Sequence, residues 1–487
     1  MPHAVCPLPM NRRDFLQTTA AASAAPLVVP RHVLGGVGFT APSDTVSVGM
    51  IGAGGMGAAN ATALISRDDV RIGAIADVDM GTVRRAVDGR MGSDDPSRRR
   101  SGRRLRDAYD AARAFADYRE MLTEADDLDA VVIATPDHAH AYAAMMAMDR
   151  SLAVYVQKPL AATVQECRWL RAKADATGVA VQMGNQGHSG DDGRRVVEVI
   201  RAGVLGPIRD VQAWTNRPNG WWPQGVPASA PEPVPDGLLW DLYLGGNDEQ
   251  PYRPGIHPFG WRGWVGFGTG SLGDMGAHLV DFPVWALDLP RPHRVETRHT
   301  PWGGGHEAKD TYPLATVTTY DFPHLGASSG EANAGQALRM TWFDGGLLPP
   351  TPSFAPDGFR LDPNGGVLFI GERGVLVHET YGSNPRFLSA TSNLDLTAEA
   401  AAVPRTLPRI EGGHEDNWIR AIKGEEPLSC SIPYAAHLTE IMLLGVSAMR
   451  AGAPLAVALD GTITNRTDAD AILGRTYRSG WNPADLA

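Results

Sequence analysis

Cysteine is scarce in this chain, and its three cysteines lack the spacing of a metal or redox motif. Cys6, Cys167 and Cys430 form no C-x-x-C pair. The sequence therefore indicates neither a zinc site nor a disulfide framework, and we expect no metal. Cys6 lies in the leader segment described below. A disulfide between the other two stays open, because an oxidising compartment would permit it.

An excess of positive charge is also missing. The chain carries 44 lysines and arginines against 55 acidic residues, a net charge of −11 with a pI near 5.7. Binding of nucleic acid or of an anionic membrane needs a basic surface, so we expect neither partner. No internal repeat is evident. A length of 487 residues with 43% hydrophobic content suits a soluble protein of two domains.

The first 43 residues resemble a twin-arginine export signal with its linker. Residues 11–16 read N-R-R-D-F-L, and an alanine-rich apolar run continues to Val29 with small residues at positions 22–24. The run is too short for a stable membrane span, and its lack of a polar face disfavours a short amphipathic helix. Because this route carries folded proteins, we expect a periplasmic or extracytoplasmic protein that acquires its cofactor before export.

A glycine-rich turn follows the first apolar strand. Gly52, Gly54 and Gly57 form G-x-G-x-x-G directly after a strand predicted over residues 46–51, a spacing that suits a tight turn, close approach of a pyrophosphate and helix packing. A second strand, predicted over 70–76, ends at Asp77, whose carboxylate would accept hydrogen bonds from the adenosine ribose. This spacing favours a dinucleotide site over a turn built only for packing. Asp77 would repel a 2′-phosphate, so NAD is favoured over NADP. Arginines at 84 and 85 leave NADP open.

Alternation of strands and helices continues to residue 185. Strands are predicted over residues 130–134, 152–156 and 179–183, and each is followed by polar residues: T-P-D-H-A-H, Q-K-P and G-N-Q-G-H. In a doubly wound parallel sheet the carboxyl ends of the strands line the ligand crevice. We therefore predict an α/β Rossmann domain over residues 44–185.

Five motifs in order resemble the Gfo/Idh/MocA oxidoreductases. They are GAGGMG, then Asp77, then ATPDHAH, YVQKP and, at residues 273–281, GDMGAHLVD. The resemblance implies a C-terminal α/β domain, here residues 186–487, whose large, open, mostly antiparallel sheet forms the substrate floor and often the oligomer contact, so a homo-oligomer is expected. The chain departs from the family's E-K-P at Gln157, and a carboxylate that would tune Lys158 is thereby absent.

The resemblance also assigns site residues. The cofactor-binding set is Gly52, Gly54, Gly55, Met56, Gly57, Asp77, Thr135, Pro136, His138, His140, Lys158 and Asn185. Lys158, His278 and Asp274 form the expected catalytic set, with Lys158 as donor to the substrate oxygen, His278 as acid/base and Asp274 as its orienter. Alternatives are helix capping by Asp274, His138 or His140, and a metal site of His188, His278 and Asp274, which nothing in their spacing supports.

Tryptophans in the middle of the chain suggest a carbohydrate platform. Six fall within about fifty residues, at positions 214, 221, 222, 240, 261 and 264, and aromatic faces stack on sugars while polar neighbours read hydroxyls. Some must belong to the core, so we expect at most two to touch substrate. The expected substrate-binding set is His188, Trp261, Arg262, Asp274 and His278. A proline-rich loop over residues 223–237 is a candidate cover.

These observations predict an exported NAD(P)-dependent oxidoreductase with tightly bound cofactor. Its substrate is a small-molecule carbohydrate: a sugar, cyclitol or glycoside. One alternative is an NAD-dependent glycosidase that oxidises C3 transiently and eliminates the aglycone. Another is a non-catalytic sugar-binding protein with structural nucleotide, which the presence of Lys158 and His278 disfavours.

Overall fold

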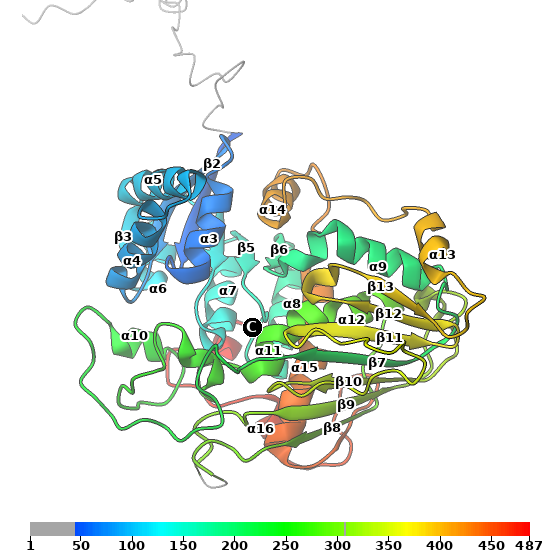
Figure 1. Cartoon of the computed structure of the whole chain (residues 1–487). Coiled ribbons are helices and arrows are strands. Elements are labelled where there is room, and N and C mark those ends of the chain that lie inside the picture. The colour runs from blue at the N-terminus through cyan, green and yellow to red at the C-terminus, as the bar shows by residue number, and fades with distance from the viewer. Residues whose placement is uncertain (1–43, 306–307) are drawn as a thin grey trace, which may run out of the picture. The chain divides into compact units, whose positions relative to one another are not determined.

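The structure is a computed structural model that describes residues 44–305 and 308–487. The predicted export signal, with Cys6, lies outside the described residues. From Val46 onward the chain builds two β-sheets joined by a shared hydrophobic core (Figure 1).

The first sheet is parallel and has six strands in the order β3-β2-β1-β4-β5-β6. The strands are β1 (Val46–Ile51), β2 (Val70–Ala76), β3 (Arg113–Phe115), β4 (Ala130–Ile133), β5 (Ala153–Val156) and β6 (Val181–Met183). Strands β1 and β2 confirm the predicted bounds, and β4, β5 and β6 are one or two residues shorter than predicted. This is the predicted doubly wound Rossmann sheet.

Helices cover both faces of this sheet. They are α3 (Gly55–Leu64), α4 (Met80–Met91), α5 (Pro96–Ala111), α6 (Tyr118–Glu124), α7 (His140–Asp149) and α8 (Val164–Thr177). Short polar residues set several of their starts, as expected for N-caps. Asp79 accepts from the Thr82 amide at the start of α4, and Thr163 forms a capping box with Glu166 at the start of α8.

The second sheet has eight strands in the order β13-β12-β11-β7-β10-β9-β8-β14. All neighbours pair antiparallel except β7 and β10, which pair parallel. The strands are β7 (Ile208–Thr215), β8 (Arg294–His299), β9 (Thr316–Phe322), β10 (Leu338–Phe343), β11 (Gly365–Gly371), β12 (Gly374–His378), β13 (Arg386–Ser389) and β14 (Leu455–Ala456). The predicted α/β fold with a large, mostly antiparallel second sheet is confirmed.

The remaining helices connect and cover this sheet. They are α9 (Asp191–Arg201), α10 (Trp240–Leu244), α11 (Gly270–Leu279), α12 (Asp281–Leu287), α13 (Leu396–Ala402), α14 (His414–Ile422), α15 (Ile432–Ala451) and α16 (Ala469–Leu473). Among the described residues, α15 alone has the length and hydropathy to cross a membrane. It packs against α8, α11 and β8, and 83% of its apolar stretch is buried, so it is a core helix.

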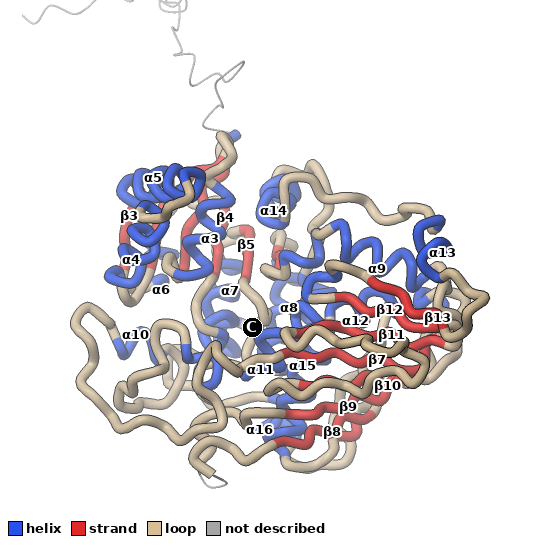
Figure 2. The backbone as a smooth tube through the Cα atoms, viewed as in Figure 1, coloured by secondary structure: helices blue, strands red, loops and turns tan. Residues whose placement is uncertain are grey.

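Two segments of the second half return to the Rossmann sheet. Trp418 and Ile419 of α14 belong to the hydrophobic core under α3, and Glu415 accepts a hydrogen bond from Asn60 at 2.6 Å. The second segment, residues 216–269 between β7 and α11, we term the crossing loop; it is mostly irregular and contains α10 (Figure 2). Its Leu239 amide donates to the carbonyl of Val78, just beyond β2, at 2.9 Å.

Candidate functional site

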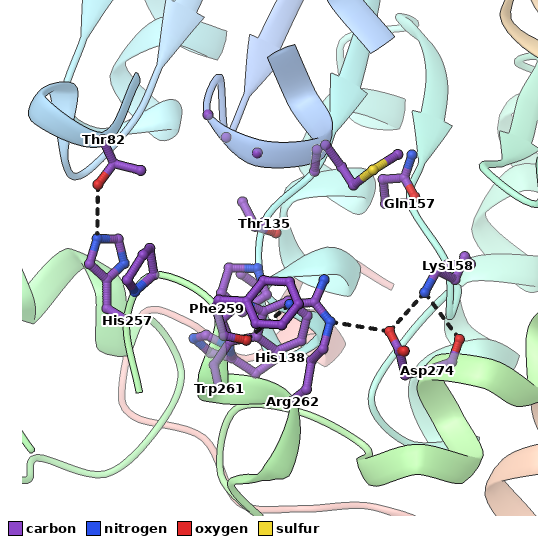
Figure 3. Close-up of a pocket in the computed structure, with 18 of the residues that line it drawn as sticks. Thr82, Thr135, His138, Gln157, Lys158, His257, Phe259, Trp261, Arg262 and Asp274 are labelled. Carbon is purple, nitrogen blue, oxygen red and sulfur yellow. Dashed lines mark hydrogen bonds and ion pairs between the residues drawn. The ribbon is translucent and has the colours of Figure 1, made fainter. Parts of the chain in front are cut away.

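A cavity of about 670 Å³ begins at the glycine-rich turn after β1 and extends to α11 and the crossing loop (Figure 3). It lies beyond the carboxyl ends of β1, β2, β4 and β5, where open parallel sheets bind ligands. The predicted site residues that line it are Gly52, Gly54, Gly55, Met56, Asp77, Thr135, Pro136, His138, Lys158, Trp261, Arg262, Asp274 and His278. The predicted cofactor and substrate groups thus share one cavity.

The glycine-rich turn is shaped to admit a dinucleotide. Gly52 has a φ of +81°, and a Cβ on Gly57 would lie 1.8 Å from the carbonyl oxygen of Gly52, so α3 packs on the turn without side chains between them. A Cβ on Gly55 would meet no atom within 4 Å, which leaves open space at the helix start for a phosphate. Across the cavity, the buried hydroxyl of Thr135 has no hydrogen-bond partner in residues 44–305 and 308–487.

Asp77 is bound to the turn itself. Its Oδ2 accepts from the amides of Ala53 at 2.9 Å and Gly54 at 3.3 Å, while Oδ1 accepts from the amide of Asp79 at 2.9 Å. Burial raises the pKa of Asp77, and the three backbone donors oppose that rise. The carboxylate therefore fixes the shape of the turn while it lines the cavity at the end of β2.

The crossing loop closes over the same end of the cavity. His257 lies 2.9 Å from Asp79 Oδ2 through its Nε2 and 3.4 Å from the hydroxyl of Thr82, as Figure 3 shows for the histidine and threonine. Arg85 donates to the Thr82 hydroxyl at 2.6 Å. The second half of the chain is thus tied by side chains to the start of α4.

At the other end of the cavity, two cations converge on one carboxylate. The Nζ of Lys158 donates to Asp274 Oδ1 at 2.8 Å and to the Asp274 carbonyl at 3.0 Å, and Arg262 Nε donates to Oδ1 at 3.2 Å (Figure 3). Burial alone would raise the pKa of Asp274, but Lys158 and Arg262 hold it well below its usual range. Lys158 follows β5 and Asp274 lies in α11, so this group joins the two halves of the fold.

His278 is a neutral imidazole beside this group. Burial, with a contribution from the Lys158 ammonium, lowers the pKa of His278 to about 3. Its Nδ1–H donates to Asn185 Oδ1 at 3.1 Å, which leaves the lone pair on Nε2. The prediction that Asp274 orients His278 is therefore wrong: Asn185 does so, and Asp274 is bonded to Lys158 and Arg262. The ring of Tyr381 meets it edge to face with centroids 4.8 Å apart. An imidazole in this state offers Nε2 as a hydrogen-bond acceptor, and with a pKa of about 3 it is a weak base unless the charges around it change.

Four predicted site residues do not line the cavity. Gly57 supports the turn from below, and Asn185 acts on His278 as described. His140 is buried with its ring nitrogens 2.9 Å and 3.0 Å from the carbonyls of Pro159 and Thr135. His188 is buried against Asp281, with Nδ1 3.0 Å from the carboxylate, so it faces the protein interior.

The structure also bears on three alternatives that the sequence left open: helix capping by Asp274, a disulfide and a metal site. Thr269, not Asp274, occupies the N-cap of α11, so the capping interpretation of Asp274 is wrong. Cys167 and Cys430 are free and buried. In residues 44–305 and 308–487 no group of three histidine, cysteine or acidic side chains is placed to hold a metal ion.

The tryptophan cluster divides between cavity and core. Trp221 and Trp222 line the cavity, and Trp214, Trp240 and Trp264 pack in hydrophobic clusters. Trp261 does both, since it lines the cavity and packs with Trp240 and Trp264. Residues 223–237, the expected cover, do not line the cavity; the parts of the crossing loop on either side do.

Several lining residues carry little or no sequence signal. Arg217 and Tyr381 lie in loops after β7 and β12, and His257 lies in the crossing loop. None belongs to a motif of recognisable spacing. Arg217 has one sequence signal: it is among the polar residues between the clustered tryptophans, which were expected to read the hydroxyls of a sugar.

Comparison with known proteins agrees with this architecture. Residues 46–185 match the oxidoreductase family's NAD-binding Rossmann fold, residues 191–299 match its C-terminal alpha/beta domain, and residues 9–29 match a twin-arginine translocation signal. The two oxidoreductase models together match more than half of the chain. The predicted family and signal are thereby confirmed.

Curated relatives match over part of their length. A glycosyl hydrolase family 109 protein of Shewanella baltica is 29% identical over 214 residues, which cover 41% of this chain and 44% of the relative. The alpha-N-acetylgalactosaminidase of Shewanella oneidensis is 28% identical over 214 residues with the same coverage. The chain therefore spans less than half the length of the curated relatives it matches.

Solved structures share the fold at low sequence identity. The WlbA dehydrogenase from Bordetella pertussis, in complex with NADH and UDP-GlcNAcA, has a TM-score of 0.54 at 15% identity and covers 85% of this chain and 99% of that one. GenD2 from gentamicin A biosynthesis, in complex with NAD, has a TM-score of 0.51 at 18% identity and covers 88% and 99%. With the NAD-binding Rossmann domain and the C-terminal alpha/beta domain both matched, the chain belongs to the Gfo/Idh/MocA oxidoreductase family.

Proposed function

We propose that this protein is exported and transfers hydride to or from a carbinol of a sugar, cyclitol or glycoside. The observation that carries the proposal is the single cavity in which the glycine-rich turn and the Lys158, Asp274 and His278 group meet. Aromatic side chains of the crossing loop, among them Trp221 and Trp261, line its outer part and suit the apolar faces of a sugar ring.

Different residues bind the cofactor, stabilise the alkoxide and accept the proton. The turn from Gly52 to Gly57 and the end of β2 at Asp77 would hold the dinucleotide, which supplies the hydride acceptor or donor when it is bound. Lys158, oriented by Asp274, donates a hydrogen bond to the carbinol oxygen and stabilises its developing negative charge. His278 takes the hydroxyl proton on Nε2, because Asn185 holds the proton on Nδ1.

Location and assembly follow from the same proposal. The export signal would deliver the folded protein, with its nucleotide, to the periplasm or another extracytoplasmic space. Free NAD is scarce there, so a tightly bound cofactor recycled within the site suits that compartment. The open face of the eight-stranded sheet is the surface we expect to form a homo-oligomer, by resemblance to the family.

A second candidate is an NAD-dependent glycosidase. It is favoured by the glycosyl hydrolase names of the matched relatives and by the presence of two proton-handling groups, a cation and a neutral base, at one site. Transient oxidation at C3 makes the C2 proton acidic; loss of that proton expels the aglycone. Addition of water at C1, with return of a proton to C2 and of hydride to C3, leaves no net redox change.

Nucleotide content tests the first proposal. Freshly purified protein is denatured, and the supernatant is analysed for NAD(H) and NADP(H). We expect close to one NAD(H) per chain, because residues of the crossing loop line the cavity and His257 ties the loop to the start of α4. Active protein that releases neither nucleotide would contradict tight retention, and a predominance of NADP(H) would contradict the role of Asp77 at the ribose.

One proton separates the two candidates. A dehydrogenase has no need to break the C2–H bond, whereas the elimination route must exchange it with solvent. Glycosides are incubated with the protein in D2O and their products examined by NMR. Deuterium at C2 without net NADH formation supports the glycosidase, and stoichiometric NADH with C2 unlabelled supports the dehydrogenase.

A further inference from the structure

Arg217 places a positive charge at the end of the cavity that holds Lys158, Asp274 and His278, which we term the sugar end. It follows β7, the strand that pairs with both β10 and β11 in the second sheet, and it lines the cavity together with Trp221 and Tyr381. Its guanidinium lies 3.5 Å from the centroid of the Trp221 ring, and its Nη1 donates to Asn216 Oδ1 at 2.5 Å. Stacking and this hydrogen bond hold the guanidinium plane in place.

This guanidinium differs from the other cations of the cavity in its pairing. Lys158 and Arg262 share the carboxylate of Asp274. Arg217 forms no ion pair in residues 44–305 and 308–487, and within that part of the chain its Nε and Nη2 make no hydrogen bond. Burial accordingly lowers the pKa of Arg217. Asp274 partly offsets this effect through its charge, but it makes no direct contact with Arg217 and is already bonded to Lys158 and Arg262. A partly buried guanidinium without a direct ion pair is a suitable partner for an anion in the cavity.

The charge balance of the sugar end points the same way. Three cations, Lys158, Arg217 and Arg262, line this end of the cavity with one carboxylate, Asp274, and His278 there is neutral. Asp137 lies behind the lining, and burial raises its pKa to about 7, so it supplies at most part of a second negative charge at neutral pH. The field of Arg217 contributes to the lowered pKa of His278, which places it at the reacting end of the cavity. The glycine-rich turn, with its open helix start, already provides for the dinucleotide phosphates at the other end.

We propose that the substrate carries a carboxylate, as a uronic acid or its glycoside does, and that Arg217 binds it through the free edge of its guanidinium. The planar fork of arginine matches a carboxylate with two parallel hydrogen bonds. The inference rests on the proposed function, in that this end of the cavity is the sugar site. It makes Arg217 a specificity-determining residue.

Matched pairs of acidic and neutral sugars test this inference in the nucleotide-bound protein. Methyl β-D-glucuronide is compared with methyl β-D-glucoside, and methyl α-D-galacturonide with methyl α-D-galactoside, by isothermal titration calorimetry. We expect at least one uronide to bind tenfold or more tightly than its neutral partner. Arg217→Gln should bring the ratio of the two affinities to within about twofold of one, since only the uronide makes the charge-assisted contact that is lost.

Control variants isolate the guanidinium. Arg217→Lys keeps the charge without the fork and should recover only part of the preference. Arg298→Gln alters an arginine whose side chain is 83% exposed on β8 and should change nothing. Unchanged nucleotide content and circular dichroism in every variant show that the fold is retained, so a lost preference is not a folding defect.

Other outcomes overturn the inference. Equal affinity for acidic and neutral sugars in the unmodified protein, a preference that survives in Arg217→Gln, or no uronide binding at millimolar concentration each exclude a carboxylate site at Arg217. Reduction of bound nucleotide, followed at 340 nm, reports separately on the proposed function. A neutral glycoside that reduces it while uronides do not bind would reject this inference alone, and uronides that bind through Arg217 without any redox or hydrolytic turnover would reject the proposed function alone.

Discussion

The Lys158 ammonium is held by Asp274 through two hydrogen bonds, to the carboxylate at 2.8 Å and to the main-chain carbonyl at 3.0 Å. The family's E-K-P motif, by resemblance, would put a carboxylate beside this lysine at position 157. Here Gln157 donates instead to Asn60 Oδ1 at 3.0 Å. The negative charge thus comes from α11 in the second half of the fold, so the charge pair depends on how the two halves pack.

The first prediction follows from this pair. Lys158→Ala should lower turnover by about a hundredfold or more, because one positioned hydrogen-bond donor to a developing negative charge is typically worth that much. Asp274→Asn should also lower turnover, since it removes the carboxylate that orients Lys158. Nucleotide content should stay unchanged in Asp274→Asn. Turnover is measured as reduction of bound nucleotide at 340 nm, and Lys309→Ala, at an exposed lysine outside the cavity, is the matched control. Near-normal turnover in both site variants contradicts the assignment.

The second prediction concerns pH. Because the pKa of His278 is lowered to about 3, the imidazole is neutral at every pH above about 4, and kcat/KM should show no acidic limb near pH 6.5. The group expected to titrate near pH 7 is the carboxyl of Asp137. Burial raises its pKa to about 7, and its Oδ2 accepts a hydrogen bond from the Thr269 hydroxyl. Any change near pH 7 should therefore disappear in Asp137→Asn. A limb with a midpoint near 6.5 that persists in that variant would show that His278 titrates normally.

The same histidine shift has a consequence for stability. The folded pKa of His278 is depressed below the unfolded value of 6.5, so between these two values the unfolded chain binds more protons than the folded one. The stabilising contribution of neutral His278 to the free energy of unfolding is complete above pH 6.5 and is lost as the pH falls toward 3. Buried Asp137 has the opposite effect on stability. Because its pKa is raised to about 7 in the folded protein, its contribution to the free energy of unfolding decreases as the pH rises toward 7.

Local sequence patterns predicted the first sheet well. Apolar runs bounded by glycine or polar residues determine β1, β2, β4 and β5, and parallel strands buried on both faces are the simplest case for such an argument. The motifs then placed Asp77, Lys158 and His278 at the cavity, because strand ends in a parallel sheet converge.

Contacts between side chains far apart in the chain could not be predicted from the sequence. His188 follows β6 as Lys158 follows β5, but Asp281 and Tyr434, from distant helices, form hydrogen bonds that draw it and the carboxylate into the interior. The crossing loop has no periodic pattern, so the approach of His257 to Asp79 leaves no local trace. Among the described residues Arg217 has no direct ion pair, because Asp274 is bonded to Lys158 and Arg262 instead, and only the three-dimensional structure reveals such a pairing.

The third prediction concerns retention of the nucleotide. His257→Ala removes the contact of the crossing loop with Asp79 and Thr82, and a hydrogen bond to a charged group contributes about 1.5–3 kcal/mol. We expect the bound nucleotide to leave about tenfold faster or more, measured as its release into a scavenging dehydrogenase. His324→Ala, at an exposed histidine, is the control. An unchanged release rate would mean that the loop does not limit dissociation.

The last prediction uses three glycines that differ in what surrounds them. At Gly57 a Cβ would lie 1.8 Å from the carbonyl oxygen of Gly52, so Gly57→Ala must push α3 away from the turn. At Gly54 the nearest atom to a Cβ would be 3.4 Å away, an ordinary contact, and φ is −82°. At Gly89, inside α4, a Cβ would meet nothing within 4 Å.

The three alanine variants should therefore separate fold from binding. Gly57→Ala should lose nucleotide and be destabilised by about 1–3 kcal/mol, the usual cost of overpacking. Gly54→Ala should have an unchanged unfolding midpoint in urea when both proteins are measured after removal of the nucleotide. As purified, it should retain much less nucleotide, because its methyl group occupies the approach of the pyrophosphate. Gly89→Ala should keep its nucleotide and gain about 0.5–1 kcal/mol from helix propensity. If Gly54→Ala retains nucleotide as the unmodified protein does, the phosphates do not pass close to this turn, and the glycine spacing serves packing alone.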